Sequence, residues 1–461
     1  MSETLLSVGL DVGTTTTQLI VSRLTVENRA SSFAVPEMEI ADRQVVYRSP
    51  VYFTPLLGEN LVDGEGVRRI VEMEYRAANI SPWQVDTGAV IITGETSRKE
   101  NARAVLDGLS QLAGDFVVAT AGPDLESVLA AKGAGAAEYS RQTGKTVLHM
   151  DIGGGTSNLA LIEKGKIIRT GCMNVGGRLL KFDAEGKLSY VSPVLRGLTD
   201  LQPGTYPDHG QVEKVAEMLT LGLEMAAGLR PVGSLFSRLW TQETVTVWEA
   251  APSGCVISFS GGVADCIETK HSPLAFGDIG PRLGQAIRES ALCQGEYILG
   301  SQTIRATVIG AGCHSTQLSG STVFYRGVTL PIKNLPVAAF SRQEQDSQDF
   351  ALRIQQRLSR FDSHSVVVAL PGFFQGGYGR MAELAAQLLR GLEDRPVYIC
   401  LEADMAKALG QKLCLLLEKD RPCLCIDRVR LTDNSYLDVG SPVGPALPVV
   451  VKTLVLERSL V

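Results

Sequence analysis

A short pattern of residues occurs twice in this chain and limits its fold more than any other feature. The first copy, Val8–Thr16, reads VGLDVGTTT and is followed by the apolar residues Leu19–Val21. The second copy, Leu148–Thr156, reads LHMDIGGGT and is followed by Leu159–Ile162. Each copy is typical of a strand, an aspartate, a turn of glycine and threonine, and a second strand, which together form a hairpin. Two hairpins of one kind, 140 positions apart, predict two related domains that face each other.

The chain length also favours more than one domain. Its 461 residues exceed the roughly 250–300 at which a single hydrophobic core stops growing. Apolar stretches such as Val90–Thr93 and Phe116–Ala121 alternate with helical patterns such as Asp124–Gln142, and this alternation predicts an α/β fold. We expect a first half over residues 1–145, a second half over 146–320, and a further α/β region over 321–461. This last region either adds to the core of the two halves or completes it.

Composition excludes several classes of protein. The net charge is −6 and no basic stripe stands out, which argues against a nucleic-acid partner. Nine scattered cysteines and five histidines show neither a disulfide framework nor zinc-like spacing, so we expect reduced thiols in a reducing compartment. No apolar run approaches the roughly 18 residues of a membrane span. These observations predict a soluble intracellular protein with no membrane partner.

The two turns have the chemistry of a polyphosphate site. Small residues let backbone N–H groups point at an anion, and threonine hydroxyls add further donors. Asp11 and Asp151 cannot bind phosphate directly, because both are anionic. They require a divalent cation, and Mg²⁺ held through its water molecules fits best. A tight hairpin with the aspartate capping its turn is the alternative for either copy alone, and the matched pair disfavours it.

Five segments resemble motifs of the actin, sugar-kinase and seventy-kilodalton heat-shock chaperone superfamily. Leu10–Val21 resembles the first phosphate motif and Met150–Ile162 the second. Gly133–Ala137 resembles the small-residue helix at which the two halves cross. Phe259–Val263, with its paired glycines, resembles the adenosine motif, and Gly176-Gly177 resembles a further pair that nears the phosphates. The resemblance implies the actin-like ATPase fold, in which two RNase H-like halves surround a nucleotide cleft.

The resemblance also implies a role for each matching residue. Asp11 and Asp151 would be the catalytic residues, orienting Mg²⁺ and the attacking water. The β- and γ-phosphates of ATP would be held from one side by Gly13, Thr14 and Thr15, and from the other by Gly153, Gly154, Gly155 and Thr156; Gly261 and Gly262 would hold adenosine. The chain departs from the chaperones at Asn158, where they have an aspartate. Since an amide cannot accept a proton from water, we expect slow Mg-dependent hydrolysis.

Three assignments stay open at this stage. Gly376-Gly377 also resembles an adenosine motif, although Gly261-Gly262 is favoured. The second crossing helix is either Gly310–Gly312, after an expected strand at Arg305–Ile309, or Ala406–Gly410. The chaperones' catalytic lysine has no firm match, with Arg98 and Lys99 as candidates.

Over its whole length the chain resembles the ethanolamine ammonia-lyase reactivating factors of ethanolamine utilisation. Thr93–Ala102, Val308–Val323 and Tyr436–Glu457 carry this resemblance, and none is a general superfamily motif. It implies a chaperone that uses ATP and Mg²⁺ to exchange damaged cobalamin on its client lyase for intact adenosylcobalamin. It also implies a cytoplasmic location, within the ethanolamine microcompartment of bacteria.

Two other functions occur in the same superfamily. A small-molecule kinase is the alternative, but it needs an aspartate base over a substrate hydroxyl, and no sugar-kinase motif for one is evident. A filament-forming or membrane-anchored actin relative predicts an amphipathic terminal helix, whereas this chain ends in the strand-like Pro448–Leu456.

Overall fold

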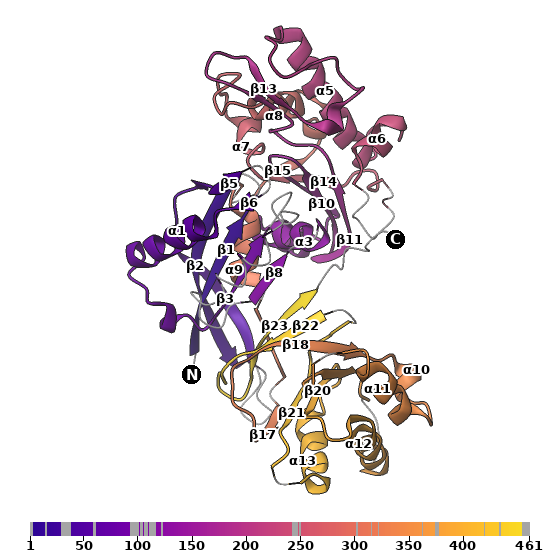
Figure 1. Cartoon of the computed structure of the whole chain (residues 1–461). Coiled ribbons are helices and arrows are strands. Elements are labelled where there is room, and N and C mark those ends of the chain that lie inside the picture. The colour runs from indigo at the N-terminus through magenta and orange to yellow at the C-terminus, as the bar shows by residue number, and fades with distance from the viewer. Residues whose placement is uncertain are drawn as a thin grey trace.

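A computed structural model describes most of the chain, and its strands form three main sheets (Figure 1). The described residues are 3–13, 16–28, 38–58, 61–92, 101, 105, 109, 117–120, 123–241, 248, 250–300, 303–314, 316–320, 322–361, 363–373, 378–418, 420–432 and 435–453. Two of the sheets hold the repeated hairpins, and the third contains strands from the last third of the chain.

The first sheet contains the N-terminal hairpin. Its strands lie in the order β3-β2-β1-β7-β8, with β4 beside β2: β1 (Glu3–Val12), β2 (Thr16–Asn28), β3 (Met38–Arg48), β4 (Tyr52–Phe53), β7 (Thr87–Ile92) and β8 (Val117–Thr120). β1 and β2 pair antiparallel, β2 and β3 likewise, whereas β7 is parallel to β1 and β8 to β7. β7 is buried at every position, as its continuous apolar run predicts for a central parallel strand.

The second sheet repeats this arrangement. Its order is β11-β10-β9-β14-β15: β9 (Val147–Ile152), β10 (Ser157–Glu163), β11 (Lys166–Met173), β14 (Val256–Ser260) and β15 (Tyr297–Leu299). The first three strands again pair antiparallel, and β14 and β15 add in parallel. The pairing registers also correspond, because Asp11 lies opposite Gln18 and Asp151 lies opposite Asn158. The two expected hairpins are therefore confirmed as equivalent parts of two equivalent sheets.

Two helices cross where the halves meet, α3 (Pro123–Gly133) and α9 (Ala306–His314) (Figure 1). Their backbones approach so closely that a Cβ on Gly133 would lie 1.9 Å from the carbonyl oxygen of Ala306. A Cβ on Gly310 would lie 2.0 Å from the carbonyl oxygen of Leu129. Glycine is therefore required on both helices for this packing.

The crossing helices correct two expectations from the sequence. The interpretation of Arg305–Ile309 as a strand is wrong, because the chain is helical from Ala306 onward. A short apolar run fits a buried helix as well as a buried strand, so its pattern alone could not decide. The expected single helix over Asp124–Gln142 is two helices, α3 and α4 (Ala136–Thr143), separated by Gly135 with φ +83°.

The remaining elements of the first 300 residues cover these sheets. In the first half, α1 (Gly64–Ala77) packs Val67, Val71 and Tyr75 against the buried face of the hairpin. In the second half, α5 (His209–Ala226), α6 (Ser234–Leu239) and α8 (Gly280–Glu289) share the largest core with the second sheet. The shorter elements are β5 (Leu56–Gly58), β6 (Leu61–Val62), η1 (Pro82–Gln84), β12 (Leu180–Phe182), β13 (Leu188–Val191), η3 (Pro193–Leu195), α7 (Asp265–Glu268) and η4 (Ala291–Cys293).

The last third of the chain forms its own eight-stranded sheet. The order is β16-β23-β22-β18-β19-β20-β21-β17: β16 (Thr316–Leu318), β17 (Phe324–Arg326), β18 (Ile332–Ala339), β19 (Val367–Leu370), β20 (Val397–Leu401), β21 (Cys423–Ile426), β22 (Ser435–Val439) and β23 (Pro448–Thr453). β18 to β21 run parallel, joined through α10 (Arg342–Gln345), α11 (Phe350–Leu358), α12 (Tyr378–Leu392) and α13 (Ala406–Leu416). Ala406–Gly410 therefore belongs to this layer, and α9 is the second crossing helix.

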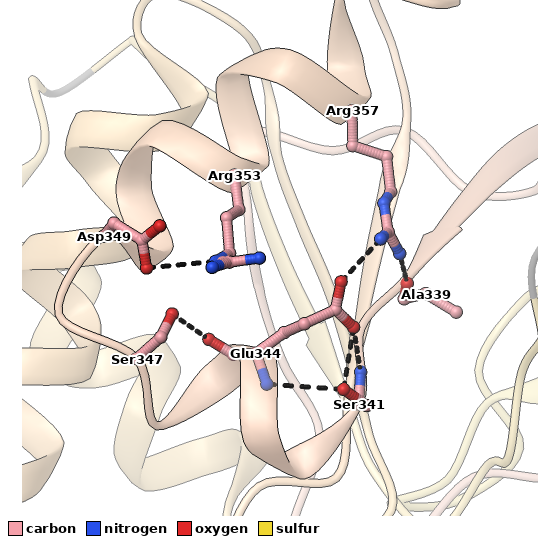
Figure 2. Close-up of polar contacts among 7 residues, drawn as sticks. All are labelled: Ala339, Ser341, Glu344, Ser347, Asp349, Arg353 and Arg357. Atoms are coloured by element: carbon pink, nitrogen blue, oxygen red, sulfur yellow. Dashed lines mark hydrogen bonds and ion pairs between the residues drawn. The ribbon is translucent and has the colours of Figure 1, made fainter.

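A polar cluster fixes the chain after β18 (Figure 2). Ser341 and Glu344 form a capping box at the start of α10. Arg357 of α11 reaches back to Glu344, at 2.6 Å, and also donates to the carbonyl oxygen of Ala339. Its guanidinium stacks over the Phe340 ring at 4.4 Å. These contacts have a structural role in holding α10 and α11 against the sheet.

Within the described residues, no helix has the length and apolar character that crossing a membrane requires.

Candidate functional site

The two Asp-x-Gly turns share one backbone geometry. The N–H of Gly13 donates to the carbonyl oxygen of Thr16 at 2.9 Å, and the N–H of Gly153 donates to that of Thr156 at 2.9 Å. Each turn therefore closes over two intervening residues, directly after the strand that carries the aspartate. Asp11 is half-buried, whereas Asp151 is buried. Thr14 and Thr15 lie outside the described residues.

The first turn rests on the short strand β4. The hydroxyl of Thr54 donates to the carbonyl oxygen of Gly13 at 2.7 Å, and Phe53 pairs with Thr16. Tyr52 donates to the buried carboxylate of Glu74 at 2.5 Å, which ties β4 to α1. This hydrogen bond, followed by burial, raises the pKa of Tyr52 to about 12. The position of the first turn thus depends on β4, a strand about 40 residues further along the chain.

Backbone from the next loop encloses the second turn. Gly177 donates to the carbonyl oxygen of Gly153 at 3.0 Å, and Arg178 donates to that of Gly154 at 2.6 Å. A Cβ on Gly176 would lie 2.3 Å from the Gly154 carbonyl oxygen, so only glycine permits this approach. At Gly155, by contrast, a Cβ would meet nothing within 4 Å. The Gly176–Arg178 backbone therefore contacts one side of the turn, and the backbone at Gly155 has open space beside it.

The structure also brings Gly261-Gly262 to the second turn. Gly261 has φ +87°, and a Cβ there would lie 2.3 Å from the carbonyl oxygen of Ile152. The N–H of Val263 donates to that same oxygen at 3.2 Å. The competing pair, Gly376-Gly377, lies outside the described residues, and the helix after it, α12, belongs to the C-terminal layer. Of the glycine pairs, Gly176-Gly177 and Gly261-Gly262 contact the second hairpin.

Asp151 is the end of a buried polar network. Ser260 donates to one carboxylate oxygen, and Thr307 of α9 donates to the other at 3.3 Å. The Ser260 hydroxyl also lies 3.0 Å from Nε2 of His149, whose Nδ1 lies 3.0 Å from the Ser258 hydroxyl. Burial raises the pKa of Asp151, against the two hydroxyl donors, and lowers the pKa of His149 to about 3. His149 is therefore neutral. A cation bound near Asp151 would favour the charged carboxylate form of Asp151.

Each aspartate faces an amide residue that holds its hairpin to a crossing segment. Asn158, opposite Asp151, donates to the buried carboxylate of Glu126 on α3 at 2.7 Å. Gln18, opposite Asp11, donates to the carbonyl oxygen of Ile304, just before α9, at 3.2 Å. The side-chain oxygens of Asn158 and Gln18 are buried and have no hydrogen-bond partner among the residues that the structure describes.

Sequence reasoning missed Glu126, Ser260, Thr307 and Gln18. The first three act on the second hairpin from other elements, so no local pattern points to them. Gln18 could have been found, because the antiparallel register of the first hairpin places it opposite Asp11, as Asn158 lies opposite Asp151. Arg98 and Lys99 lie outside the described residues.

The residues near the turns fit a metal–nucleotide complex better than a metal alone. Among the described residues, no group of three or more His, Cys, Asp or Glu side chains could hold a metal ion. Two carboxylates with open glycine backbone beside them are suited to a cation that keeps its waters and shares phosphate oxygens. At Gly155 of the second turn the backbone has open space beside it, where an anion could approach the N–H groups.

The fold and these turns define an actin-like protein, because one strand order occurs twice and the two copies meet through crossing helices. The family model for "Ethanolamine utilisation protein EutA" matches residues 3–457, and the chain belongs to this family. A protein of Salmonella typhimurium named ethanolamine ammonia-lyase reactivase EutA is 40% identical over 471 residues, covering 98% of each chain. The protein of that name from Escherichia coli is 39% identical over 464 residues, again covering 98% of each.

Solved structures with weaker similarity were also found. An Aquifex aeolicus member of the Ppx/GppA family has a TM-score of 0.40 at 11% identity, covering 67% of this chain and 97% of that one. The ethanolamine utilization protein EutJ from Carboxydothermus hydrogenoformans has a TM-score of 0.33 at 17% identity, covering 67% of this chain and 89% of that one.

Proposed function

We propose that this chain is an ATP-dependent reactivating chaperone for ethanolamine ammonia-lyase. It restores the inactivated, adenosylcobalamin-dependent lyase by exchanging damaged cobalamin for intact adenosylcobalamin. The observation that carries the proposal is the 40% identity, over 98% of both chains, to a protein named as a reactivase of this lyase. The equivalent aspartate turns support it, since they provide a reason for the dependence on ATP.

In this proposal the two turns hold the phosphates of Mg·ATP between the halves. Backbone N–H groups and hydroxyls of Gly13, Thr14, Thr15 and Gly153–Thr156 bind the phosphate oxygens, while Gly261-Gly262 lies against adenosine. Asp11 and Asp151 hold the waters of the magnesium ion. When bound, that ion neutralises phosphate charge. Asn158 is engaged by Glu126 at 2.7 Å and cannot accept a proton, so hydrolysis is slow.

The crossing helices connect this site to the rest of the protein. α9 contributes Thr307 to Asp151, α3 contributes Glu126 to Asn158, and the two helices pack on each other. A nucleotide held by both turns therefore favours one relative orientation of the halves over others. We propose that this change of orientation is what acts on the client lyase. The division into residues 1–145, 146–320 and 321–461 remains part of the same proposal.

A reactivation assay tests the function directly. Ethanolamine ammonia-lyase inactivated with cyanocobalamin would be mixed with the purified chain, Mg²⁺ and adenosylcobalamin, with and without ATP, and ammonia release followed. We expect lyase activity to recover only in the mixture that contains ATP. No recovery with ATP would contradict the proposal. A phosphorylated small molecule without recovery would indicate a kinase, and pelleting with ATP would indicate a filament-forming protein.

A further inference from the structure

Arg178 lies beside the second turn and has no role in the proposal so far. It directly follows Gly176-Gly177, and its backbone N–H donates to the carbonyl oxygen of Gly154 at 2.6 Å. Its side chain is 25% exposed. The backbone of Arg178 is thus fixed to the turn, while its side chain extends away from it and stays partly exposed.

The Arg178 side chain contacts a group from each half. Its Nε lies 3.3 Å from Oδ2 of Asp278 in the second half. Its Cζ lies 5.8 Å from the ring centroid of Phe53 in the first half, a cation–π contact. Phe53 pairs with Thr16, the residue that closes the first turn. The guanidinium therefore lies between the elements that adjoin both turns.

Asp278 is held independently of Arg178. Its other carboxylate oxygen accepts the N–H of Gly280 at 2.8 Å, at the start of α8. Gly280 in turn packs on Gly177, where a Cβ would lie 3.0 Å from the Gly280 Cα. Burial raises the pKa of Asp278 and lowers the pKa of Arg178, and their mutual attraction opposes both shifts. Both charges are partly removed from water. An anion that makes more hydrogen bonds to the guanidinium than Asp278 does would therefore stabilise the Arg178 charge more.

We propose that Arg178 binds the terminal phosphate of ATP, exchanging Asp278 for the phosphate, and so distinguishes ATP from ADP. The inference rests on the proposed function and identifies a residue of the same site. A guanidinium binds phosphate through two parallel charge-assisted hydrogen bonds, and a triphosphate beside Asp11 and Asp151 needs more positive charge than one magnesium ion supplies. ADP lacks the terminal phosphate, and Arg178 then stays with Asp278 and Phe53.

The exchange also gives nucleotide state an effect on the first half. When Arg178 leaves Phe53, the ring loses this cation–π contact; Phe53 is 77% exposed, and Leu56 and Leu57, a few positions further along the chain, are exposed as well. These residues follow the strand that supports the first turn. The presence of a terminal phosphate is thereby linked to the contacts of Phe53 on β4, the strand that supports the first turn.

Binding of the two nucleotides by variants tests the inference. Mg·ATP and Mg·ADP would be titrated calorimetrically into wild type, Arg178→Gln, Arg178→Lys and, as a control, Arg282→Gln. Arg282 is also in the second half, 21% exposed and 3.6 Å from its partner Glu213. We expect Arg178→Gln to weaken ATP binding by about 10- to 100-fold and ADP binding by about twofold at most. Arg178→Lys should lose less, and Arg282→Gln should match wild type.

A second variant keeps the inference open to refutation if Arg178→Gln fails to fold. Asp278→Asn removes the competing charge but keeps an oxygen for Gly280, so we expect ATP to bind several-fold more tightly and ADP to bind as before. Equal changes for both nucleotides, or none, in the folded variants would overturn the inference. Wild-type protein that binds neither nucleotide would instead contradict the proposed function.

Discussion

The two Asp-x-Gly turns have the same backbone hydrogen bond and different surroundings. The second turn is enclosed by backbone of its own half, with Gly176 and Gly261 each in a position where a side chain would clash with it. The first turn depends on Thr54 and on β4, which is fixed through Tyr52 and Glu74. Asp151 is buried among hydroxyl donors, whereas Asp11 is half-buried. The second turn is therefore enclosed by backbone of its own half, whereas the first turn is held by β4, a separate segment about 40 residues further along the chain.

This difference shows what local sequence controls and what it does not. Residues close in the chain determine the hydrogen bond across each turn, because that bond needs only a glycine and three neighbours. The pKa of Asp151 depends on groups far away in sequence, such as Ser260 and Thr307, whose hydroxyls donate to its carboxylate. Changes made in matched pairs, one in each half, test how far the two turns have diverged.

The largest effect is expected from the aspartates themselves. Asp11→Asn and Asp151→Asn should each reduce ATP-dependent recovery of the lyase by roughly 100-fold or more, because each removes a charge proposed to hold the metal waters. Circular dichroism should show an unchanged fold. Wild-type recovery by both variants would remove the metal role, and loss in the Asp151 variant alone would show that the first turn does not share the metal.

A smaller effect is expected from glycine at the second turn. Gly176→Ala places a methyl group 2.3 Å from the Gly154 carbonyl oxygen, so we expect a loss of about 2 kcal/mol in unfolding free energy and weaker ATP binding. Gly155→Ala is the matched control, since its methyl group meets nothing within 4 Å, and its unfolding free energy should change by about 0.5 kcal/mol at most. Equal urea-unfolding midpoints for both variants would show that the turn is not tightly enclosed.

The two amides give a more direct comparison of the halves. Asn158→Asp puts a second carboxylate against Glu126 and should cost roughly 1–3 kcal/mol of stability, while also changing the rate of ATP turnover. Gln18→Glu puts a buried carboxylate opposite Asp11 and against the Ile304 carbonyl oxygen, and should also cost roughly 1–3 kcal/mol of stability. Phosphate release and thermal unfolding measure both effects. Unchanged turnover in the Asn158 variant would place that residue away from the attacking water.

The smallest effect concerns pH. Because burial raises the folded-state pKa of Asp151, the folded protein without nucleotide binds that proton more tightly than the unfolded chain does. This contribution to stability is present below the unfolded pKa and is lost as pH rises through the folded pKa. Asp151→Asn should therefore lose less stability than wild type between acidic and neutral pH. If the unfolding free energies of the two proteins, measured with urea, changed equally over that pH range, the prediction would be contradicted.

Much of the fold could be predicted from particular segments. The hairpins at Asp11 and Asp151 are predicted from their repeat, and the apolar runs Val90–Thr93 and Phe116–Ala121 coincide with the strands β7 and β8. The helix at Ala306–His314 could not, because its short apolar start fits either structure and its packing against α3 decides the outcome. The contact between Glu126 and Asn158 was also beyond prediction, since it joins a helix to a strand whose relative placement no local pattern reports.

The sequence by itself determined the two turns, their aspartates and their threonines, because a tight hairpin is specified by residues that touch within a few positions of one another. The tertiary structure alone decided that Gly176-Gly177 and Gly261-Gly262 pack against the second hairpin, which helix crosses between the halves, and how deeply each aspartate is buried. Those outcomes depend on contacts between residues far apart in the chain. Their energies are settled only when the sheets and helices pack together.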